Sequence, residues 1–204
     1  AHFDFVFRHL QIGKDRDAKL VLELGTGDGS YGIRLASQGY RVVGCDITSA
    51  MLRIVQERQS QSPNAMALML ADVETLPIKE SSIDIVFSGY TLHHFPDLKP
   101  IASEIARVLK PGGLLCVVEP NGSNPILGAN RFLVHVPFLK TLRSKTTSVN
   151  EQMLSVSHLK SVLRDVGFTG FDLATFSHPT RFVKPNPDWR IRFIVRIRSM
   201  IVAI

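Results

Sequence analysis

Cysteine is scarce in this sequence, with only Cys45 and Cys116 among 204 residues. Two cysteines allow one disulfide at most, and a disulfide is the less favoured interpretation. Both stand in apolar, strand-like runs, so we expect buried free thiols in a reducing compartment. No apolar run approaches the roughly 18 residues that a membrane-spanning helix needs, and no signal-peptide pattern opens the chain. Since the first residue is Ala1 rather than Met, targeting stays open, and cytoplasm is the default expectation.

Basic residues are also scarce in the first two thirds of the chain. Residues 1–130 hold 12 Lys and Arg against 14 Asp and Glu, a net charge of −2, whereas residues 131–204 hold 12 against 4, a net charge of +8. This asymmetry favours an anionic partner for the C-terminal third: a substrate, a membrane surface or a nucleic acid. Solvated surface charge explains it about equally well.

Apolar strands alternate with helices along the chain. We expect strands over 19–24, 41–47, 65–72, 82–89, 114–120 and 169–177, and helices over 30–39, 50–59, 99–110 and 155–168. Fully apolar strands that alternate with helices predict a parallel sheet covered on both faces. Segment 186–198 begins with a helix-start signal, although its apolar residues alternate as in a strand; we expect a helix there, followed by a strand over 199–204.

The expected fold is therefore α/β and doubly wound. It is a Rossmann-like sheet of about seven strands, mostly parallel with an antiparallel last strand, and it has helices on both faces. We expect one domain over residues 1–204, since its 204 residues and 45% hydrophobic content suit a single globular core. Its parts are a core (19–120), a substrate-side insert (121–150), and a C-terminal helix with the last strands (155–204).

The stretch LVLELGTGDGSYG, residues 20–32, joins an apolar strand to a glycine-rich turn. Gly25, Gly27 and Gly29 have the spacing G-x-G-x-G, not the G-x-G-x-x-G of dinucleotide sites, and no Gly-Lys-Ser/Thr follows, which excludes a P-loop. Glu23 lies two residues before the turn. A carboxylate there repels a pyrophosphate but attracts a cationic ligand.

Two further acids end the second and third predicted strands. Asp46 can accept hydrogen bonds from both hydroxyls of a ribose, and Asp72 lies on the same rim and can accept from an adenine amino group. Three acids with no basic residue among them suit an uncharged adenosine joined to a cationic centre. That description fits S-adenosylmethionine, which has a sulfonium.

Four motifs carry a family resemblance: VLELGTGDG, VVGCDIT, ADVETLPIKESSIDIVFSGYTLHHFPD and VLKPGGLLCVVEP. In this order and spacing, the sequence resembles class I S-adenosylmethionine-dependent methyltransferases of the small-molecule group that includes the ubiquinone and menaquinone biosynthesis C-methyltransferases. The motifs cover residues 19–120, and the element order extends the resemblance to the end of the chain. The resemblance implies a methyl transfer with S-adenosylhomocysteine as product.

The resemblance also implies a set of cofactor-binding residues, drawn from the ends of the first four strands. They are Glu23, Gly25, Thr26, Gly27, Gly29, Asp46, Ile47, Met51, Asp72, Val73, Ser88 and Gly89.

Within this set, the glycine loop with Thr26 would lie under the methionine and ribose, braced by Glu23. Asp46 would hold the ribose, while Ile47 and Met51 would pack on adenine. The adenine amino group would bind Asp72 and a ring nitrogen would bind the Val73 amide. Ser88 and Gly89 would line the methionine end. Met51 is as easily a core residue, Ser88 is as easily small for packing only, and the sequence assigns no role to Asp28.

The segment LHHFPD supplies the candidate catalytic residues, His93 and His94. Transfer from a sulfonium is an in-line displacement that depends mainly on positioning, and a base is needed only when the acceptor loses a proton. Either histidine could be that base, shape the pocket, or serve in packing. His135 and His158 are weaker candidates, and no Cys or His residues have metal-ligand spacing, so we expect no metal.

The acceptor is inferred partly from what is missing. No Asn-Pro-Pro-Tyr/Phe segment, no Pro-Cys pair and no pair of acids follows the fourth strand, which argues against nucleobase and protein arginine methylation. Segments 126–145 and 181–198 mix apolar and cationic side chains. They favour a hydrophobic or acidic acceptor, such as a lipid, quinone precursor or other secondary metabolite, and peripheral contact with a membrane. A lid and a final helix with exposed arginines account for them equally well.

Three other classes stay open. A non-catalytic protein that binds S-adenosylmethionine or S-adenosylhomocysteine would keep the same acids. An RNA methyltransferase would use the basic C-terminal third, and a nicotinamide-dependent oxidoreductase would need a phosphate-friendly loop. The sequence leaves the oligomeric state open.

Overall fold

The computed structural model describes residues 18–120, 154–177 and 191–198. The elements along the chain are β1 (Leu20–Leu24), α2 (Gly32–Ser37), β2 (Arg41–Asp46), α3 (Ser49–Arg58), β3 (Ala67–Leu70), β4 (Ile83–Gly89), the 3₁₀ helix η2 (Leu92–His94), α4 (Lys99–Val108), β5 (Leu109–Pro120), α6 (Val156–Asp165), β6 (Phe171–Ser177) and β7 (Ile191–Arg198). Each expected strand or helix between residues 19 and 177 is present, with ends shifted by a few residues. The expected insert at 121–150 lies outside the described residues.

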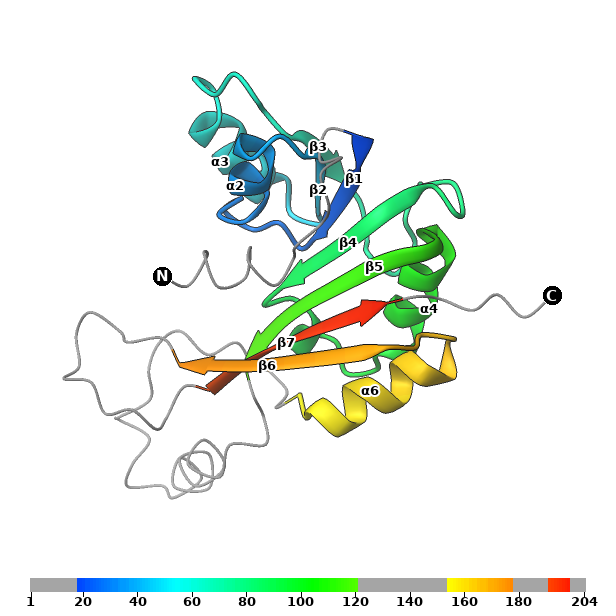
Figure 1. The fold of residues 1–204 in the computed structure, drawn as a ribbon. Helices are drawn as coiled ribbons and strands as arrows, with labels where there is room; N and C mark the ends of the chain where they lie inside the picture. Colours follow the sequence, from blue (N-terminus) through cyan, green and yellow to red (C-terminus); the bar gives the residue numbers. More distant parts are fainter. Residues whose placement is uncertain (1–17, 121–153, 178–190, 199–204) are drawn as a thin grey trace.

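The strands form one sheet in the order β3-β2-β1-β4-β5-β7-β6 (Figure 1). The pairs β3–β2, β2–β1, β1–β4 and β4–β5 are parallel, and β7 is antiparallel to both β5 and β6. The predicted α/β class and mostly parallel sheet are confirmed. The chain moves outward from β1 to β3 and then returns to β4 on the other side of β1, so the order reverses between β1 and β4. Ligands of such sheets bind at this reversal, outside the carboxyl ends of the strands.

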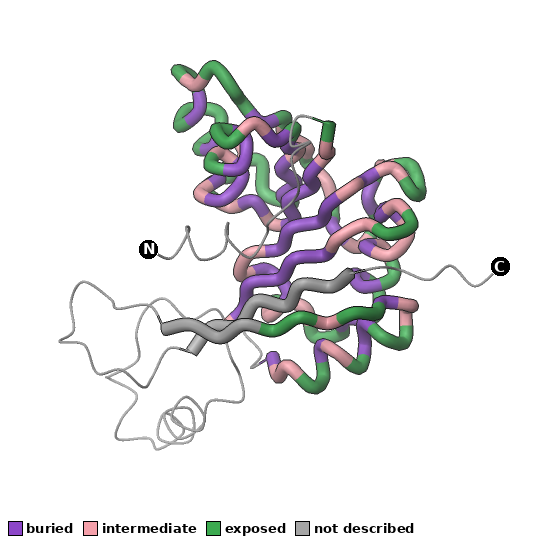
Figure 2. The backbone as a smooth tube through the Cα atoms, viewed as in Figure 1, coloured by how far each residue is buried: buried purple, intermediate pink, exposed green. Residues whose placement is uncertain are grey.

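Alternate residues of the central strands point to opposite faces of the sheet, as the strand repeat of two requires. Leu22, Val86 and Leu115 pack with α4 and α6, while Val21, Ile85 and Cys116 belong to a second cluster with residues of α2 and α3. Helices therefore cover both faces, and β4 and residues 115–119 of β5 are mostly buried (Figure 2).

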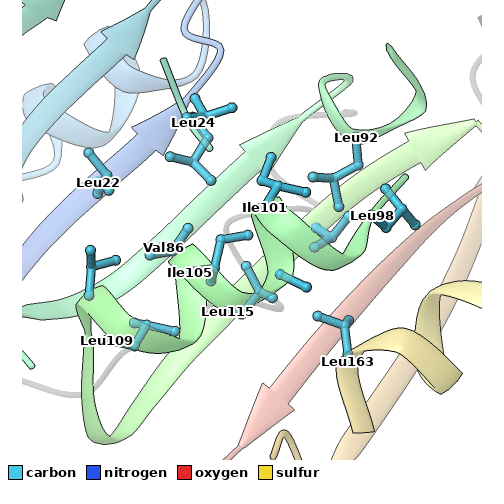
Figure 3. Packing of buried hydrophobic residues seen from close by; sticks show 14 of the residues in the cluster. Leu22, Leu24, Val86, Leu92, Leu98, Ile101, Ile105, Leu109, Leu115 and Leu163 are labelled. Atoms are coloured by element: carbon cyan, nitrogen blue, oxygen red, sulfur yellow. The ribbon is translucent and has the colours of Figure 1, made fainter. Parts of the chain in front are cut away.

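The larger cluster lies between the sheet and α4 (Figure 3). Ile101, Ile105 and Val108 follow a helical spacing of three and four residues, so they share the buried face of α4. Each fully buried aliphatic side chain contributes about 1.5–3 kcal/mol of transfer free energy. This packing fixes β4 and β5, and with them the turn that follows β4.

The end of the chain corrects one prediction. A helix over 186–198 is wrong for Ile191–Arg198, which form β7. The helix-start signal at 186–188 competes with alternating apolar residues, and pairing with strands on both sides favours the extended form. The helix-start signal itself and the strand expected over 199–204 lie outside the described residues.

The Pro-Gly-Gly turn at 111–113 acts differently from a simple stop. Helix α4 ends at Val108 rather than at 110, because the residue before a proline disfavours helical geometry. Strand β5 then begins at Leu109, with an irregular register to β4 between the Ile83–Leu109 and Ile85–Leu114 pairs. Residues 111–113 therefore lie within the first part of β5, where the pairing with β4 is irregular.

Both cysteines are buried and reduced. Cys45 packs in the α4-side cluster and Cys116 in the α2-side cluster, so the sheet separates the two thiols. Among the helices that the structure describes, none combines the length and apolarity needed to cross a membrane.

Candidate cofactor and acceptor site

The glycine loop after β1 is built on left-handed backbone. Gly25, Gly27 and Gly29 have φ values of +60°, +51° and +74°, a region that favours glycine. A Cβ on Gly25 would lie 2.5 Å from Cγ2 of Thr91, so the loop touches the turn after β4. Within the described part of the chain the side of Gly27 is open, since a Cβ there would find no atom closer than 4.0 Å. The loop thus leaves space at its centre for a ligand to approach the backbone.

Glu23 braces this loop from below. Its side chain is buried; Oε1 accepts a hydrogen bond from the Gly32 amide at 3.1 Å, and Oε2 accepts one from the Thr26 hydroxyl. Burial raises the pKa of Glu23 to about 7, against the opposing effect of these two donors. Glu23 therefore ties the loop to the first turn of α2.

Asp46 reaches the loop from the end of β2. Oδ2 accepts a hydrogen bond from the Gly27 amide at 2.9 Å, and Oδ1 accepts one from the Thr48 amide at 2.8 Å. A carboxylate has about four lone-pair sites, so capacity remains for ribose hydroxyls.

Ile47 follows this acid in the chain, Leu70 is its register partner on β3, and Met51 lies in the first turn of α3. Ile47 is 70% exposed, Leu70 is 59% exposed and Met51 is 38% exposed, so Met51 is not a core residue. Exposed apolar surface next to a buried acid suits a flat purine ring whose ribose reaches the acid.

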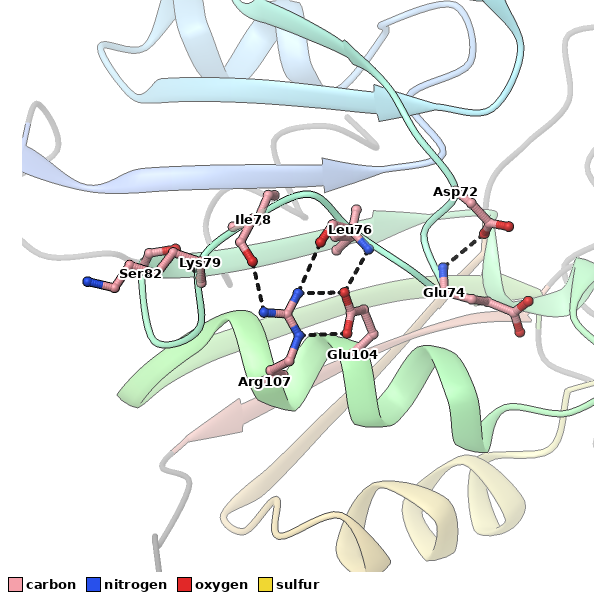
Figure 4. A network of polar contacts seen from close by, with 8 residues as sticks. All are labelled: Asp72, Glu74, Leu76, Ile78, Lys79, Ser82, Glu104 and Arg107. Carbon is pink, nitrogen blue, oxygen red and sulfur yellow. Dashed lines mark hydrogen bonds and ion pairs between the residues drawn. The ribbon is translucent and has the colours of Figure 1, made fainter.

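Asp72 lies in the loop after β3, because the strand ends at Leu70 rather than at 72. Its Oδ1 accepts a hydrogen bond from the Glu74 amide at 2.9 Å, which closes a local turn, and Val73 is buried. Further along, Arg107 of α4 donates to the carbonyls of Leu76 and Ile78 at 3.1 and 2.8 Å (Figure 4).

Glu104 completes this network on α4. It pairs with Arg107 at 2.6 Å and accepts the Leu76 amide at 2.7 Å. The hydrogen bond from Arg107 holds the pKa of Glu104 below its usual range, against the effect of burial. The helix thereby fixes the loop that carries Asp72.

Ser88 and Gly89 end β4, next to the order reversal. Ser88 is fully buried, and its hydroxyl has no hydrogen-bond partner within the described part of the chain. A buried hydroxyl without a partner is unfavourable, so this position suits a polar group of a ligand. Tyr90 follows with φ of +60°, held by a hydrogen bond from its amide to the Val118 carbonyl at 2.8 Å. Such backbone strain is often found at functional sites.

Asp28 has a structural role that the sequence did not reveal. It accepts hydrogen bonds from the Ser30 amide and hydroxyl and forms an ion pair with Arg58 of α3 at 2.6 Å. Although burial acts in the opposite direction, these bonds and the Arg58 charge lower the pKa of Asp28. The pair holds the outer side of the glycine loop against α3.

His93 and His94 both lie in η2, but their side chains have different surroundings. The His93 side chain is only 11% exposed, and its Nδ1 lies 2.7 Å from Oε2 of Glu119, whereas His94 is exposed with its ring 4.1 Å from that of His93.

The sequence analysis did not single out Glu119. It could have been found in the same way as Asp46, because both are acids at the end of an apolar strand. His158, in the first turn of α6, is exposed, and His135 lies outside the described residues.

These features fit S-adenosylmethionine better than a dinucleotide. The first residues after β1, β2 and β3, at 25–29, 47–48 and 71–74, include no lysine or arginine, and the nearby acids Glu23, Asp46 and Asp72 suit a cation better than a pyrophosphate. The open side of Gly27, the exposed Ile47 and the buried hydroxyl of Ser88 each match one part of the molecule. Among the described residues, no three His, Cys, Asp or Glu side chains are grouped as metal ligands.

Known proteins share this architecture. Residues 22–117 match the family model described as Methyltransferase domain. The chain is 34% identical over 109 residues to malonyl-[acyl-carrier protein] O-methyltransferase of Hamiltonella defensa, which covers 53% of this chain and 41% of that protein. It is 27% identical over 194 residues to demethylmenaquinone methyltransferase of Thermus thermophilus, and this alignment covers 88% of each chain.

A solved S-adenosylmethionine-dependent methyltransferase structure from Methanosarcina mazei has a TM-score of 0.75, at 24% identity, over 96% of this chain and 98% of that one. This likeness shows the fold. The chain spans between 19% and 41% of the length of three curated relatives that it matches.

The predicted resemblance and the predicted cofactor are confirmed by these comparisons. Residues 22–117, just under half of the chain, match the methyltransferase-domain family, and the chain resembles class I S-adenosylmethionine-dependent methyltransferases, among them the quinone biosynthesis enzymes.

Proposed function

We propose that this protein transfers the methyl group of S-adenosylmethionine to a small hydrophobic or acidic acceptor. The observation that carries the proposal is the Asp46 carboxylate, which reaches the Gly27 amide from the neighbouring strand. This contact joins the ribose-binding acid to the glycine loop, so one rigid unit would hold both halves of the cofactor.

Each residue of this unit has a specific task. Asp46 would accept the ribose hydroxyls, Asp72 and the Val73 amide would bind the adenine edge, and Ile47 with Met51 would cover its face. Ser88 would hydrogen-bond the methionine end. The cofactor supplies an electrophilic methyl group on sulfur; the protein would hold the acceptor in line with it, with the reacting atoms about 3–3.5 Å apart.

The acceptor class is supported by relatives and by charge. One relative is named for malonyl-[acyl-carrier protein] and another for demethylmenaquinone, one an acidic thioester and the other a lipid-like quinone. The net charge of +8 over residues 131–204 agrees with an acidic acceptor, or with an anionic membrane surface that holds a lipid-like one. We place the protein in the cytoplasm, with peripheral membrane contact through this basic third. Sedimentation with anionic vesicles, and not with neutral ones, would support that contact.

A labelled-methyl assay tests the function. The protein is incubated with S-adenosylmethionine carrying a radioactive methyl group and with fractions of a lipid and small-molecule extract. Label is expected in an organic-soluble product, and the Asp46→Ala variant should form none. Binding of the cofactor without transfer to any fraction would instead indicate a non-catalytic binding protein, and label in RNA would indicate a different acceptor class.

We place seven strands in the complete sheet, with β7 as the antiparallel strand between β5 and β6. Slow hydrogen exchange of the amides of residues 191–198 would support this arrangement, because edge loops exchange quickly.

A further inference from the structure

A buried carboxylate stands behind His93 at the carboxyl end of the sheet. Glu119 is the penultimate residue of β5 and is fully buried. Its Oε1 accepts hydrogen bonds from the amides of Thr91 and Leu92 at 2.9 and 2.7 Å, and its Oε2 lies 2.7 Å from Nδ1 of His93.

This geometry fixes the histidine tautomer. The two amides hold Oε1 and set the plane of the carboxylate, so Oε2 is directed at the imidazole. A carboxylate offers only acceptors, so we infer that Nδ1 carries the proton of this bond. The neutral ring then has its lone pair on Nε2, the atom that can accept a proton.

The pair lies beside the cofactor loop. Thr91 begins the turn that carries His93; its hydroxyl donates to the Leu24 carbonyl at 2.9 Å, and its side chain fills the space beside Gly25. Strands β1 and β4 are neighbours, and the sheet order reverses between them. His93 is thus held at the ligand-binding edge by Glu119 of β5 and by the Thr91 turn.

We propose that His93 is the general base of the transfer and that Glu119 is its positioning residue. The proposal rests on the function proposed above and narrows the acceptor to a group that loses a proton, such as a phenolic or enolic hydroxyl, rather than a tertiary amine. Nε2 of His93 takes the hydroxyl proton while an oxygen lone pair forms the bond to the methyl carbon. The carbon–sulfur bonding pair stays on sulfur, and the imidazolium later releases its proton to water.

The tautomer can be measured without knowing the acceptor. In protein labelled with ¹⁵N-histidine, long-range ¹H–¹⁵N spectra at alkaline pH should show His93 protonated on Nδ1. The signal is assigned by its loss in His93→Asn, with exposed His158→Asn as control. In Glu119→Gln the amide can donate to Nδ1, so the proton should move to Nε2. Protonation of wild-type His93 on Nε2, or an unchanged tautomer in Glu119→Gln, would overturn the proposal.

Kinetics test the catalytic part with the acceptor found in the labelled-methyl assay. Both Glu119→Gln and His93→Asn should lower kcat by about 10²–10⁴-fold. The KM for the acceptor and the Kd for S-adenosylhomocysteine should stay within about threefold, and exposed Glu57→Gln serves as the matched control. Asn at position 93 still offers Glu119 a donor, so this variant decides the case if Glu119→Gln does not fold. Unchanged kcat in the folded variants, or an acceptor that loses no proton, would contradict the proposal.

The two proposals fail separately. Wild-type protein that binds no S-adenosylhomocysteine and labels no fraction would refute the methyltransferase function, whereas the tautomer measurement would still decide whether Glu119 directs His93.

Discussion

Asp46 and Gly27 are joined across two parallel strands by a hydrogen bond of 2.9 Å from the Gly27 amide to the Asp46 carboxylate. The acid at the end of β2 therefore organises the loop that follows β1, in addition to offering its free lone pairs to a ligand. Removing the Asp46 carboxylate should therefore weaken ligand binding in two ways: the ligand loses its own contact with the acid, and the glycine loop loses the hydrogen bond that orders it.

Replacing Asp46 tests this double role. In Asp46→Asn the amide nitrogen or oxygen can satisfy only one of the two backbone donors, and the charge is lost. A hydrogen bond to a charged group contributes about 1.5–3 kcal/mol, so the Kd for S-adenosylhomocysteine should rise by about 10- to 100-fold. Calorimetric titration measures it. Glu57→Gln, an equal change of charge at an exposed site of α3, should bind normally; equal affinities for all three proteins would refute the role.

Gly25 and Gly112 both have left-handed backbone, but only Gly25 lies against another side chain. Substituting each with alanine therefore distinguishes the effect of backbone strain from the effect of a steric clash. Gly25→Ala adds a Cβ 2.5 Å from a Thr91 methyl carbon, while Gly112→Ala, at φ +75°, adds one into open space. In both variants, backbone strain should lower the free energy of unfolding by about 1–2 kcal/mol. Only Gly25→Ala should also displace η2 and abolish cofactor binding. Guanidinium unfolding and titration with S-adenosylhomocysteine measure both effects, and equal behaviour of the two variants would show that the Thr91 contact is unimportant.

Glu23 should make stability depend on pH. Burial raises its folded-state pKa to about 7 from 4.5. The folded protein therefore holds a proton that the unfolded chain has released, and the stabilisation present below pH 4.5 is lost as pH rises through 7. The loss is on the order of 3 kcal/mol. Denaturant unfolding between pH 4.5 and 8 should show it in wild type, and Glu23→Gln should lack that share of the decline. Parallel pH profiles of the two proteins would contradict the assignment.

The Arg107 fork should stabilise the loop that carries Asp72. Arg107→Met removes hydrogen bonds to two loop carbonyls and leaves Glu104 without its cation. The melting temperature should fall, and S-adenosylhomocysteine should bind more weakly because Asp72 loses its support. Arg53→Met, on the exposed side of α3, is the matched control and should leave both values unchanged. A fall in melting temperature without weaker binding would limit the fork to a structural role.

Much of the fold could be predicted because its signals are local. Continuous apolar strands and helical spacing identified the elements up to residue 177. The end of the chain was harder, since Asn186, Pro187 and Asp188 favour a helix start while the alternating residues after them favour a strand. Pairing of β7 between β5 and β6 decides the outcome, and a local pattern does not contain that pairing.

In the candidate site, too, some roles follow from local sequence signals and others depend on long-range contacts. Glu23, Asp46 and the glycine loop follow from position at strand ends. His93 and His94 are adjacent and chemically identical in sequence, and the contact with Glu119, 26 residues away, and the burial of His93 distinguish them in the structure. Asp28 likewise gains its role from Arg58, 30 residues away. Long-range contacts, rather than residue types, set these roles.

Calorimetric titration of the wild-type protein tests the central claim, an acidic rim shaped for a sulfur-containing nucleoside. S-Adenosylhomocysteine and NAD are titrated separately under the same conditions. The account predicts saturable binding of S-adenosylhomocysteine at one site per chain and no heat of binding with NAD. Tight binding of NAD together with no binding of S-adenosylhomocysteine would contradict it.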